Sequence, residues 1–316
     1  MTVIKGDVEM PDNKIRFKYF LLHPRYFAIW LGLFVGFIVS LLPQSMRHWL
    51  GSQIGLYLYK NNTKRRAIVR ANLGQVFPEL SEDQLQLMIR EHLNWYGKAL
   101  IDYSLFFFGS RARLQKQVTI VGEKLLIDVK KQQQPVILFL AHSVMLEFAA
   151  VALSNNYRSF GSYKASSNPA LDWMVARSRC RFADFVVSRD EGLRPLIRAI
   201  KSQRIMIFLP DEDLGLDNAV FAPFFGRQKA TLTTPARLAR MGGAKAIAGF
   251  VAFDDASKQY QLHLQAMPEA YPVGKSEVDA LALNQALEKL ILQSPEQYLW
   301  VMKWYKTSAV QDQSIY

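Results

Sequence analysis

From about residue 117 onward, short apolar runs alternate with segments of helical periodicity, and this alternation constrains the fold more than any other feature. The strongest runs are PVILFLAH, RIMIFLP and AIAGFVAF, and the weaker ones are VTIVG, FGSYKA, DFVVS and YQLHLQAM. Almost wholly apolar runs of this length are typical of strands buried on both faces. The intervening segments with helical spacing are MLEFAAVALS, NPALDWMVARSR, EGLRPLIRAIKS, LTTPARLARMG and a tail, VDALALNQALEKLILQSPEQYLWVMKWY, which Pro295 divides into two helices. The pattern predicts an α/β domain over residues 117–310, with a mixed sheet flanked by helices.

The N-terminal part, residues 1–44, contains an uncharged run at 26–43, YFAIWLGLFVGFIVSLLP. About 17–25 apolar residues suffice for a membrane-spanning helix. We therefore predict an N-terminal membrane-anchoring helix, with a buried core helix as the alternative. Both flanks of the run are basic, so the positive-inside rule does not orient it. The chain has one cysteine, Cys180, which excludes an internal disulfide and favours a reducing compartment, so we expect the large domain on the cytoplasmic side.

Residues 45–116 predict a helical, membrane-proximal part. Apolar residues recur at three- and four-residue spacing in SQIGLYLYK, KRRAIVRANLGQVF and EDQLQLMIREHLNWYGKALIDYSLFFF. Ser81, followed by Glu82 and Asp83, is a typical helix start. We expect the apolar cluster 105–108 to be core.

The chain carries a formal net charge of +12, with a pI of about 9.7. A basic surplus of this size favours acidic partners, among them anionic lipids, acidic carrier proteins and nucleic acid. No zinc-finger, helix-turn-helix or aromatic RNA-binding pattern is present in the sequence, so nucleic acid is not an expected partner.

The first chemistry-bearing motif is His142-Ser-Val-Met-Leu-Glu147, which follows the strand PVILFLA. Reacting groups gather at the carboxyl ends of such strands. Five residues correspond to about 500° around a helix, so the two side chains meet only if His142 lies in the turn before the helix. A neutral imidazole accepts a proton near neutral pH, and a carboxylate on its other nitrogen fixes the tautomer. The alternative is an ordinary buried or capping histidine.

Three further segments carry candidate binding residues. Asp211 and Asp213 follow the strand RIMIFLP in LPDEDLG, where carboxylates can hold a hard metal, orient a hydroxyl or cap a turn. Phe224 and Phe225 precede a glycine turn and form either core or an apolar wall. Arg189 follows FVVS in a basic stretch, where an arginine can clamp a phosphate.

Together these segments resemble the lipid A biosynthesis lauroyl/myristoyl acyltransferases, within the wider glycerolipid acyltransferase superfamily. The resemblance covers nearly the whole chain, in ordered blocks. The matching positions are His142 and Glu147; Lys164 in YKASSNPALDW; Arg189; Pro210, Asp211, Asp213 and Gly215; Phe221, Pro223, Phe224, Phe225, Gly226 and Thr231; and Pro295, Glu296, Gln297, Tyr298 and Trp300. One departure is Ala248 and Gly249, which stand where the family usually has a proline; we expect a local backbone change from it.

The resemblance implies a glycerolipid acyltransferase-like fold and an inner-membrane enzyme without cofactor or metal. The donor would be acyl carrier protein, and the acceptor a hydroxyl on a primary 3-hydroxyacyl chain of a lipid A precursor. His142 would act as general base oriented by Glu147, with backbone N–H groups near the following helix stabilising the oxyanion. Substrate would be held by Lys164 and Arg189, which would contact phosphate, and by Asp211, Asp213, Gly215, Phe224 and Phe225.

Three other functions remain open from the sequence. One is another membrane acyltransferase of the glycerolipid type. A second is a non-catalytic protein that binds lipid or acyl carrier protein. A third is a hydrolase, although the sequence has no GxSxG motif to support it.

Overall fold

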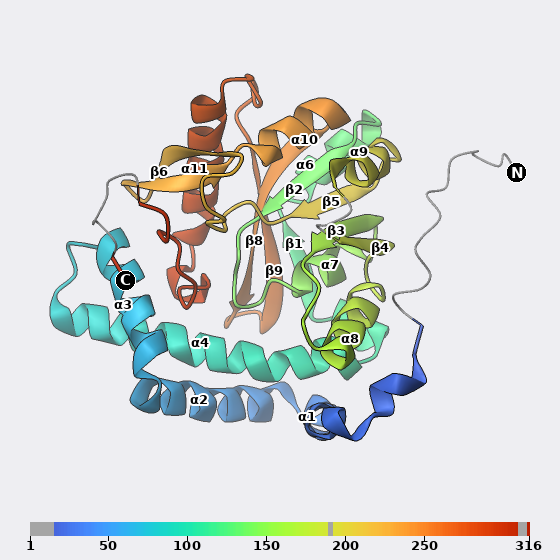
Figure 1. Cartoon of the computed structure of the whole chain (residues 1–316), viewed down its shortest axis with the longest axis vertical. Helices are drawn as coiled ribbons and strands as arrows, with labels where there is room; N and C mark the ends of the chain where they lie inside the picture. The colour runs from blue at the N-terminus through green and yellow to red at the C-terminus, as the bar shows by residue number, and fades with distance from the viewer. Residues whose placement is uncertain (1–15, 189–191, 309–314) are drawn as a thin grey trace, which may run out of the picture.

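A seven-stranded mixed sheet forms the centre of the molecule (Figure 1). The computed structural model describes residues 16–188, 192–308 and 315–316. The strand order is β1-β9-β8-β2-β5-β3-β4, and all neighbouring pairs are parallel except β8 with β9. The strands are β1 (Val118–Val121), β2 (Val136–Leu140), β3 (Ser159–Tyr163), β4 (Phe185–Ser188), β5 (Ile205–Phe208), β8 (Lys245–Asp254) and β9 (Gln259–Ala266). A separate hairpin pairs β6 (Ala219–Phe224) with β7 (Arg227–Leu232). The predicted α/β class with a mixed sheet is confirmed.

The sheet is covered on both faces, as the apolar runs predict. In β2, Val136, Leu138 and Leu140 belong to one apolar cluster, whereas Ile137 and Phe139 belong to the other. This alternation follows from the two-residue period of a strand. One cluster includes residues of α9 (Leu193–Lys201), α10 (Thr234–Gly242) and α11 (Ser276–Ile291); the other includes residues of α6 (Lys124–Lys131) and α7 (Phe148–Leu153).

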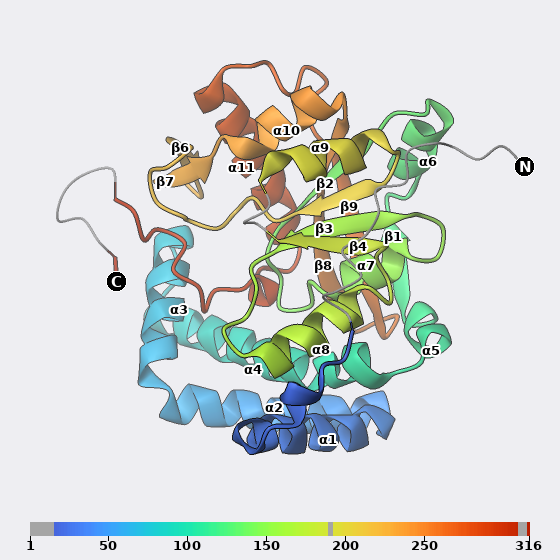
Figure 2. The ribbon, with the colours of Figure 1, turned by 45° about the vertical axis from the view of Figure 1, so that its right-hand side comes forward.

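The N-terminal helices lie along one side of the sheet, at the bottom of Figures 1 and 2. They are α1 (Phe27–Leu41), α2 (Gln44–Asn61), α3 (Thr63–Val76) and α4 (Glu82–Phe108), followed by α5 (Arg111–Gln115); α8 (Pro169–Arg179) lies near them. Glycines let α2 approach α4 closely, because a Cβ on Gly51 would lie 2.4 Å from the Lys98 Cα. Leu105 and Phe106 are fully buried, which confirms the core assignment for these two residues, whereas Phe107 and Phe108 are partly exposed.

The helix α1 presents much of its apolar surface outward. The span Pro24–Leu41 is long and apolar enough to cross a membrane, and only 11% of it is buried. Its large exposed side chains include Phe27, Phe34 and Leu41. Two short 3₁₀ turns, Tyr19–Leu22 and Pro24–Tyr26, precede it. The exposure argues against the alternative of a buried core helix.

Two predicted helices differ from the structure. The helix after His142 begins only at Phe148, and the tail beyond Pro295 forms a 3₁₀ turn, Pro295–Gln297, instead of a second helix. The segments that follow β2 and the 3₁₀ turn pair with each other at one point, through a bridge between Ser143 and Tyr298. Residues 144–147 then form turns that lead into α7.

Candidate active site

The backbone around His142 is held on two sides. Ala141 N–H donates to the Gly249 carbonyl of β8 at 2.9 Å, and Leu299 N–H donates to the His142 carbonyl at 2.9 Å. Gly249 is part of the departure from the family pattern. At this position β8 stays paired with both β2 and β9. The histidine is therefore fixed in a turn beyond the carboxyl end of β2, as its position in the sequence predicts.

The His142 side chain pairs with Asp211. Its Nδ1 lies 2.6 Å from Asp211 Oδ1, and its backbone N–H donates to Oδ2 at 2.8 Å. The Tyr298 hydroxyl donates to the same Oδ2 at 2.9 Å. Asp211 follows β5, the neighbour of β2 in the sheet. An Nδ1–H bonded to a carboxylate leaves Nε2 unprotonated, which is the tautomer that a general base needs.

Asp211 is buried but keeps its charge. Burial by itself would raise the pKa of this carboxyl, yet the contacts with His142 outweigh it and hold the pKa below its usual value. The Trp304 ring lies 5.7 Å from the imidazole and stacks on Tyr298 at 4.7 Å. The His142–Asp211 pair therefore packs beside the rings of Trp304 and Tyr298.

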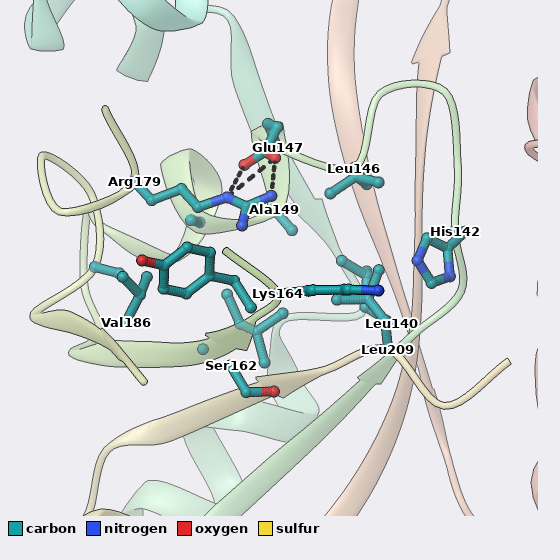
Figure 3. Close-up of a pocket in the computed structure, with 15 residues that line it drawn as sticks. Leu140, His142, Leu146, Glu147, Ala149, Ser162, Lys164, Arg179, Val186 and Leu209 are labelled. Carbon is teal, nitrogen blue, oxygen red and sulfur yellow. Dashed lines mark hydrogen bonds and ion pairs between the residues drawn. The ribbon is translucent and has the colours of Figure 1, made fainter. Parts of the chain in front are cut away.

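Glu147 does not take the place that the sequence predicts. Both of its oxygens accept hydrogen bonds from Arg179 Nε, at 3.1 and 3.0 Å, and Arg179 Nη2 also donates to it (Figure 3). In place of the predicted His142–Glu147 contact, the structure pairs His142 with Asp211. The physical reason is the irregular turn of residues 143–147, which carries Glu147 to the start of α7, on the opposite side of the cavity.

A cavity of about 210 Å³ joins the two pairs. His142 lies at one side and the Glu147–Arg179 pair at another (Figure 3). Lys164, just beyond β3, extends across the cavity toward His142. The walls between are mainly apolar, from Leu140, Leu146, Ala149, Ala150, Ala183, Val186, Ile207 and Leu209. The arrangement places the His142–Asp211 pair at the side of a largely apolar cavity.

Several predicted binding residues lie elsewhere. Asp213 accepts from the Thr307 backbone N–H at 2.6 Å and from the Thr307 hydroxyl at 2.7 Å, so it tethers the C-terminal segment. Gly215 donates to Asp213 at 3.1 Å from a left-handed conformation (φ +98°), which explains the glycine. Phe224 is fully buried, and Phe225 packs against Trp300 with ring centroids 5.9 Å apart. Phe224 therefore belongs to the core, the partly buried Phe225 packs against that core, and other residues line the cavity.

The sequence predicts substrate binding by Asp211, and it assigns no role to Tyr298 or Arg179. The available signal for Asp211 was its position after a strong strand, the same context as His142. Arg189, the predicted phosphate clamp, lies outside the described residues.

The family model described as bacterial lipid A biosynthesis acyltransferase matches residues 14–307. The chain belongs to this family. It is 30% identical over 296 residues to the lipid A biosynthesis lauroyltransferase of Escherichia coli K12, covering 93% of this chain and 96% of that protein. It is 29% identical over 302 residues to the palmitoleoyltransferase of the same organism, covering 95% and 98%.

A third relative is the lipid A biosynthesis myristoyltransferase of the same organism, which is 25% identical over 290 residues and covered over 88% of its length. The chain is thus a lipid A biosynthesis acyltransferase, and its acceptor is a lipid A precursor. The resemblance predicted from the ordered motifs is confirmed. The relatives act with different acyl chains by name, so membership alone does not identify the chain transferred.

Proposed function

We propose that this acyltransferase moves a lauroyl- or myristoyl-type chain from acyl carrier protein to a hydroxyl of a primary 3-hydroxyacyl chain, with His142 as general base and Asp211 as its orienting carboxylate. The observation that carries the proposal is the His142–Asp211 contact of 2.6 Å beside the apolar cavity. This assignment moves the orienting role from Glu147 to Asp211.

The transfer needs one base that later acts as an acid. His142 Nε2 removes the proton of the acceptor hydroxyl, and that oxygen attacks the thioester carbonyl. The tetrahedral intermediate collapses, the C–S bond breaks, and the leaving thiolate receives the proton from the imidazolium. Asp211 stabilises that imidazolium and keeps Nδ1 as its donor. The surplus of 12 positive charges suits an acidic carrier protein as donor.

Two of the backbone amides near the start of α7, which the sequence suggested as donors to the developing oxyanion, already donate elsewhere. Val144 N–H donates to the Gln297 carbonyl at 2.9 Å, and Phe148 N–H donates to the Met145 carbonyl at 3.1 Å. Lys164 extends toward His142 across the cavity (Figure 3). We assign Lys164 to this negative charge. The phosphate-binding role of Arg189 stays a prediction.

The Glu147–Arg179 pair shapes the cavity in this proposal. A carboxylate and a guanidinium beside an apolar cavity need each other, because either charge left alone there would be strongly destabilising. Because the two charges bind each other, the rest of the cavity lining is free to contact a hydrocarbon chain, and we place the acyl chain of the donor in this cavity. The apolar lining residues then set the length of chain that the cavity accepts.

We further propose that α1 anchors the enzyme in the inner membrane, with the catalytic part on the cytoplasmic side. The support is the exposed apolar surface of α1, which continues onto Met46, Trp49 and Tyr57 of α2. Basic residues of α3, Lys64, Arg65 and Arg66, suit anionic lipid head groups nearby.

The test of function is product mass. The full chain, purified in detergent, is incubated with a lipid A precursor and acyl carrier protein charged with defined chains of 10 to 16 carbons in separate reactions. Mass spectrometry should show one added acyl group, with 12 or 14 carbons preferred. No product from any charged carrier protein, while a free acyl-coenzyme A serves as donor, would contradict the proposed donor.

A pair of matched variants identifies the orienting carboxylate. Asp211→Asn should lower kcat by about 100-fold, since it removes the charge that supports the imidazolium. Glu147→Gln should cost less, about tenfold, and act through the cavity wall. The larger loss in Glu147→Gln would return the orienting role to Glu147.

A further inference from the structure

Lys229 is a buried cation that the mechanism above leaves unused. It lies on β7 opposite Ala222 and is fully buried. Its Nζ has no hydrogen-bond partner within the described part of the chain. Its ammonium lies 5.4 Å from the Phe224 ring centroid. Burying a lysine without a direct partner is costly, so a compensating role is expected.

The Phe224 ring beside the Lys229 ammonium lies 6.4 Å from the Tyr298 ring, and the Tyr298 hydroxyl donates to Asp211. Lys229 is thus close to the loop after β5, whose carboxylates Asp211, Glu212 and Asp213 all act on it electrostatically. Lys229 in turn contributes to lowering the pKa of Asp211. The elements packed on the hairpin carry Asn284, which donates to Thr231 and to the Pro223 carbonyl; Glu288, which accepts from Phe225 N–H; and Tyr305, which donates to the Phe224 carbonyl.

The Asp211 oxygens already accept three hydrogen bonds from other donors. Oδ1 accepts from the His142 side chain, and Oδ2 accepts from the His142 backbone N–H and from Tyr298. A cation held at a distance balances the charge of the carboxylate and leaves these bonds intact.

We propose that Lys229 is a positioning residue for acyl transfer: its buried ammonium offsets the Asp211 charge without touching it, and so keeps the His142–Asp211 dyad unprotonated and ready to act as base. Without a nearby cation, a buried carboxylate would favour the imidazolium, which cannot accept a proton. The inference rests on the proposed role of this dyad.

The geometry predicts a defined pH dependence. Burial lowers the pKa of Lys229 to about 8, with the three carboxylates opposing the shift. The ammonium is therefore present below pH 8 and lost above it. Because its pKa is lower in the folded than in the unfolded state, the folded protein gains stability as pH rises through that value. An uncharged side chain of similar shape removes the cost of burial at pH 7.

The experiment compares Lys229→Met with the native enzyme over pH 5.5–9.5, in detergent, with the acyl transfer assay. We expect the acidic limb of kcat/KM to move up by about one pH unit, a loss of about tenfold on that limb, because the dyad holds its proton more tightly. The two profiles should converge above about pH 9, where Lys229 in the native enzyme is neutral. The midpoint of thermal unfolding at pH 7 should be equal or higher in the variant.

Lys258→Met is the matched control, because this lysine is exposed in the turn between β8 and β9. It should leave the profile unchanged. Lys229→Gln provides a second neutral side chain in case the methionine disturbs packing. An unshifted acidic limb in both Lys229 variants would overturn the inference, whether or not stability changes. If His142→Ala also keeps its activity, the failure lies with the dyad itself; if His142→Ala is inactive, it lies with Lys229 alone.

Discussion

Two buried hydrogen-bond networks in this protein contain the same three residue types but lie in different surroundings. At the site, His142 and Tyr298 both contact Asp211. Beside the junction of α1 and α2, His48 contacts Asp102 at 2.8 Å and Tyr260 donates to it at 2.6 Å. The two histidine side chains are similarly covered, at 14% exposed for His48 and 12% for His142. Each network thus combines histidine, aspartate and tyrosine.

The two networks differ in the cation that balances each aspartate and in whether the histidine ring faces a cavity. Arg47 Nε donates directly to Asp102 at 2.8 Å, and both side chains are fully buried. Asp211 has instead the distant Lys229. His48 packs edge-to-face against Phe253 with ring centroids 4.7 Å apart, whereas His142 lines a cavity. A direct ion pair beside a packed ring suits a structural role, whereas a distant cation beside a ring that faces a cavity suits a base.

The largest expected difference is in turnover. His142→Ala should lower kcat by ~100-fold or more, since it removes the base. His48→Ala should keep kcat within about threefold and act on stability alone. Steady-state kinetics and thermal unfolding of both variants test this. Near-native turnover in a folded His142→Ala enzyme would remove His142 from the mechanism.

For the two aspartates, the larger effect on stability is expected in the Asp102 network and not at the site. Asp102→Asn should destabilise the fold by about 3 kcal/mol, because it leaves the buried Arg47 guanidinium without its carboxylate. Asp211→Asn should cost less, as Lys229 can lose its proton at modest expense. Denaturant unfolding followed by tryptophan fluorescence measures both. Equal losses would mean that the counter-charges are equivalent and would break the comparison.

The smallest effects belong to the tyrosines. Tyr298→Phe removes one hydrogen bond to Asp211 and should lower kcat by about fivefold, the equivalent of about 1 kcal/mol. Tyr260→Phe should lower stability by a similar free energy and leave kcat unchanged. The same two assays measure these changes. A Tyr260→Phe enzyme with reduced kcat would show that the two networks are coupled.

The strands and most helices could be predicted because their signals are local. The apolar runs at 136–140 and 245–254 are strands because each can bury both faces, and the run at 26–43 is an exposed apolar helix. Predictions failed where a distant segment intervened. The turn after His142 and the tail at Tyr298 have helical spacing, but they pair with each other instead.

The sequence by itself determined that His142 and Asp211 each end a buried strand, and it carried the family's ordered motifs. Only the tertiary structure decided that these two strands are neighbours, although α7, β3, α8, β4 and α9 lie between them along the chain. Glu147, five residues from His142 in sequence, is turned toward Arg179. The physical reason is that hydrophobic periodicity reports which face of an element is buried, whereas the partner of a side chain depends on strand order, which long-range packing sets.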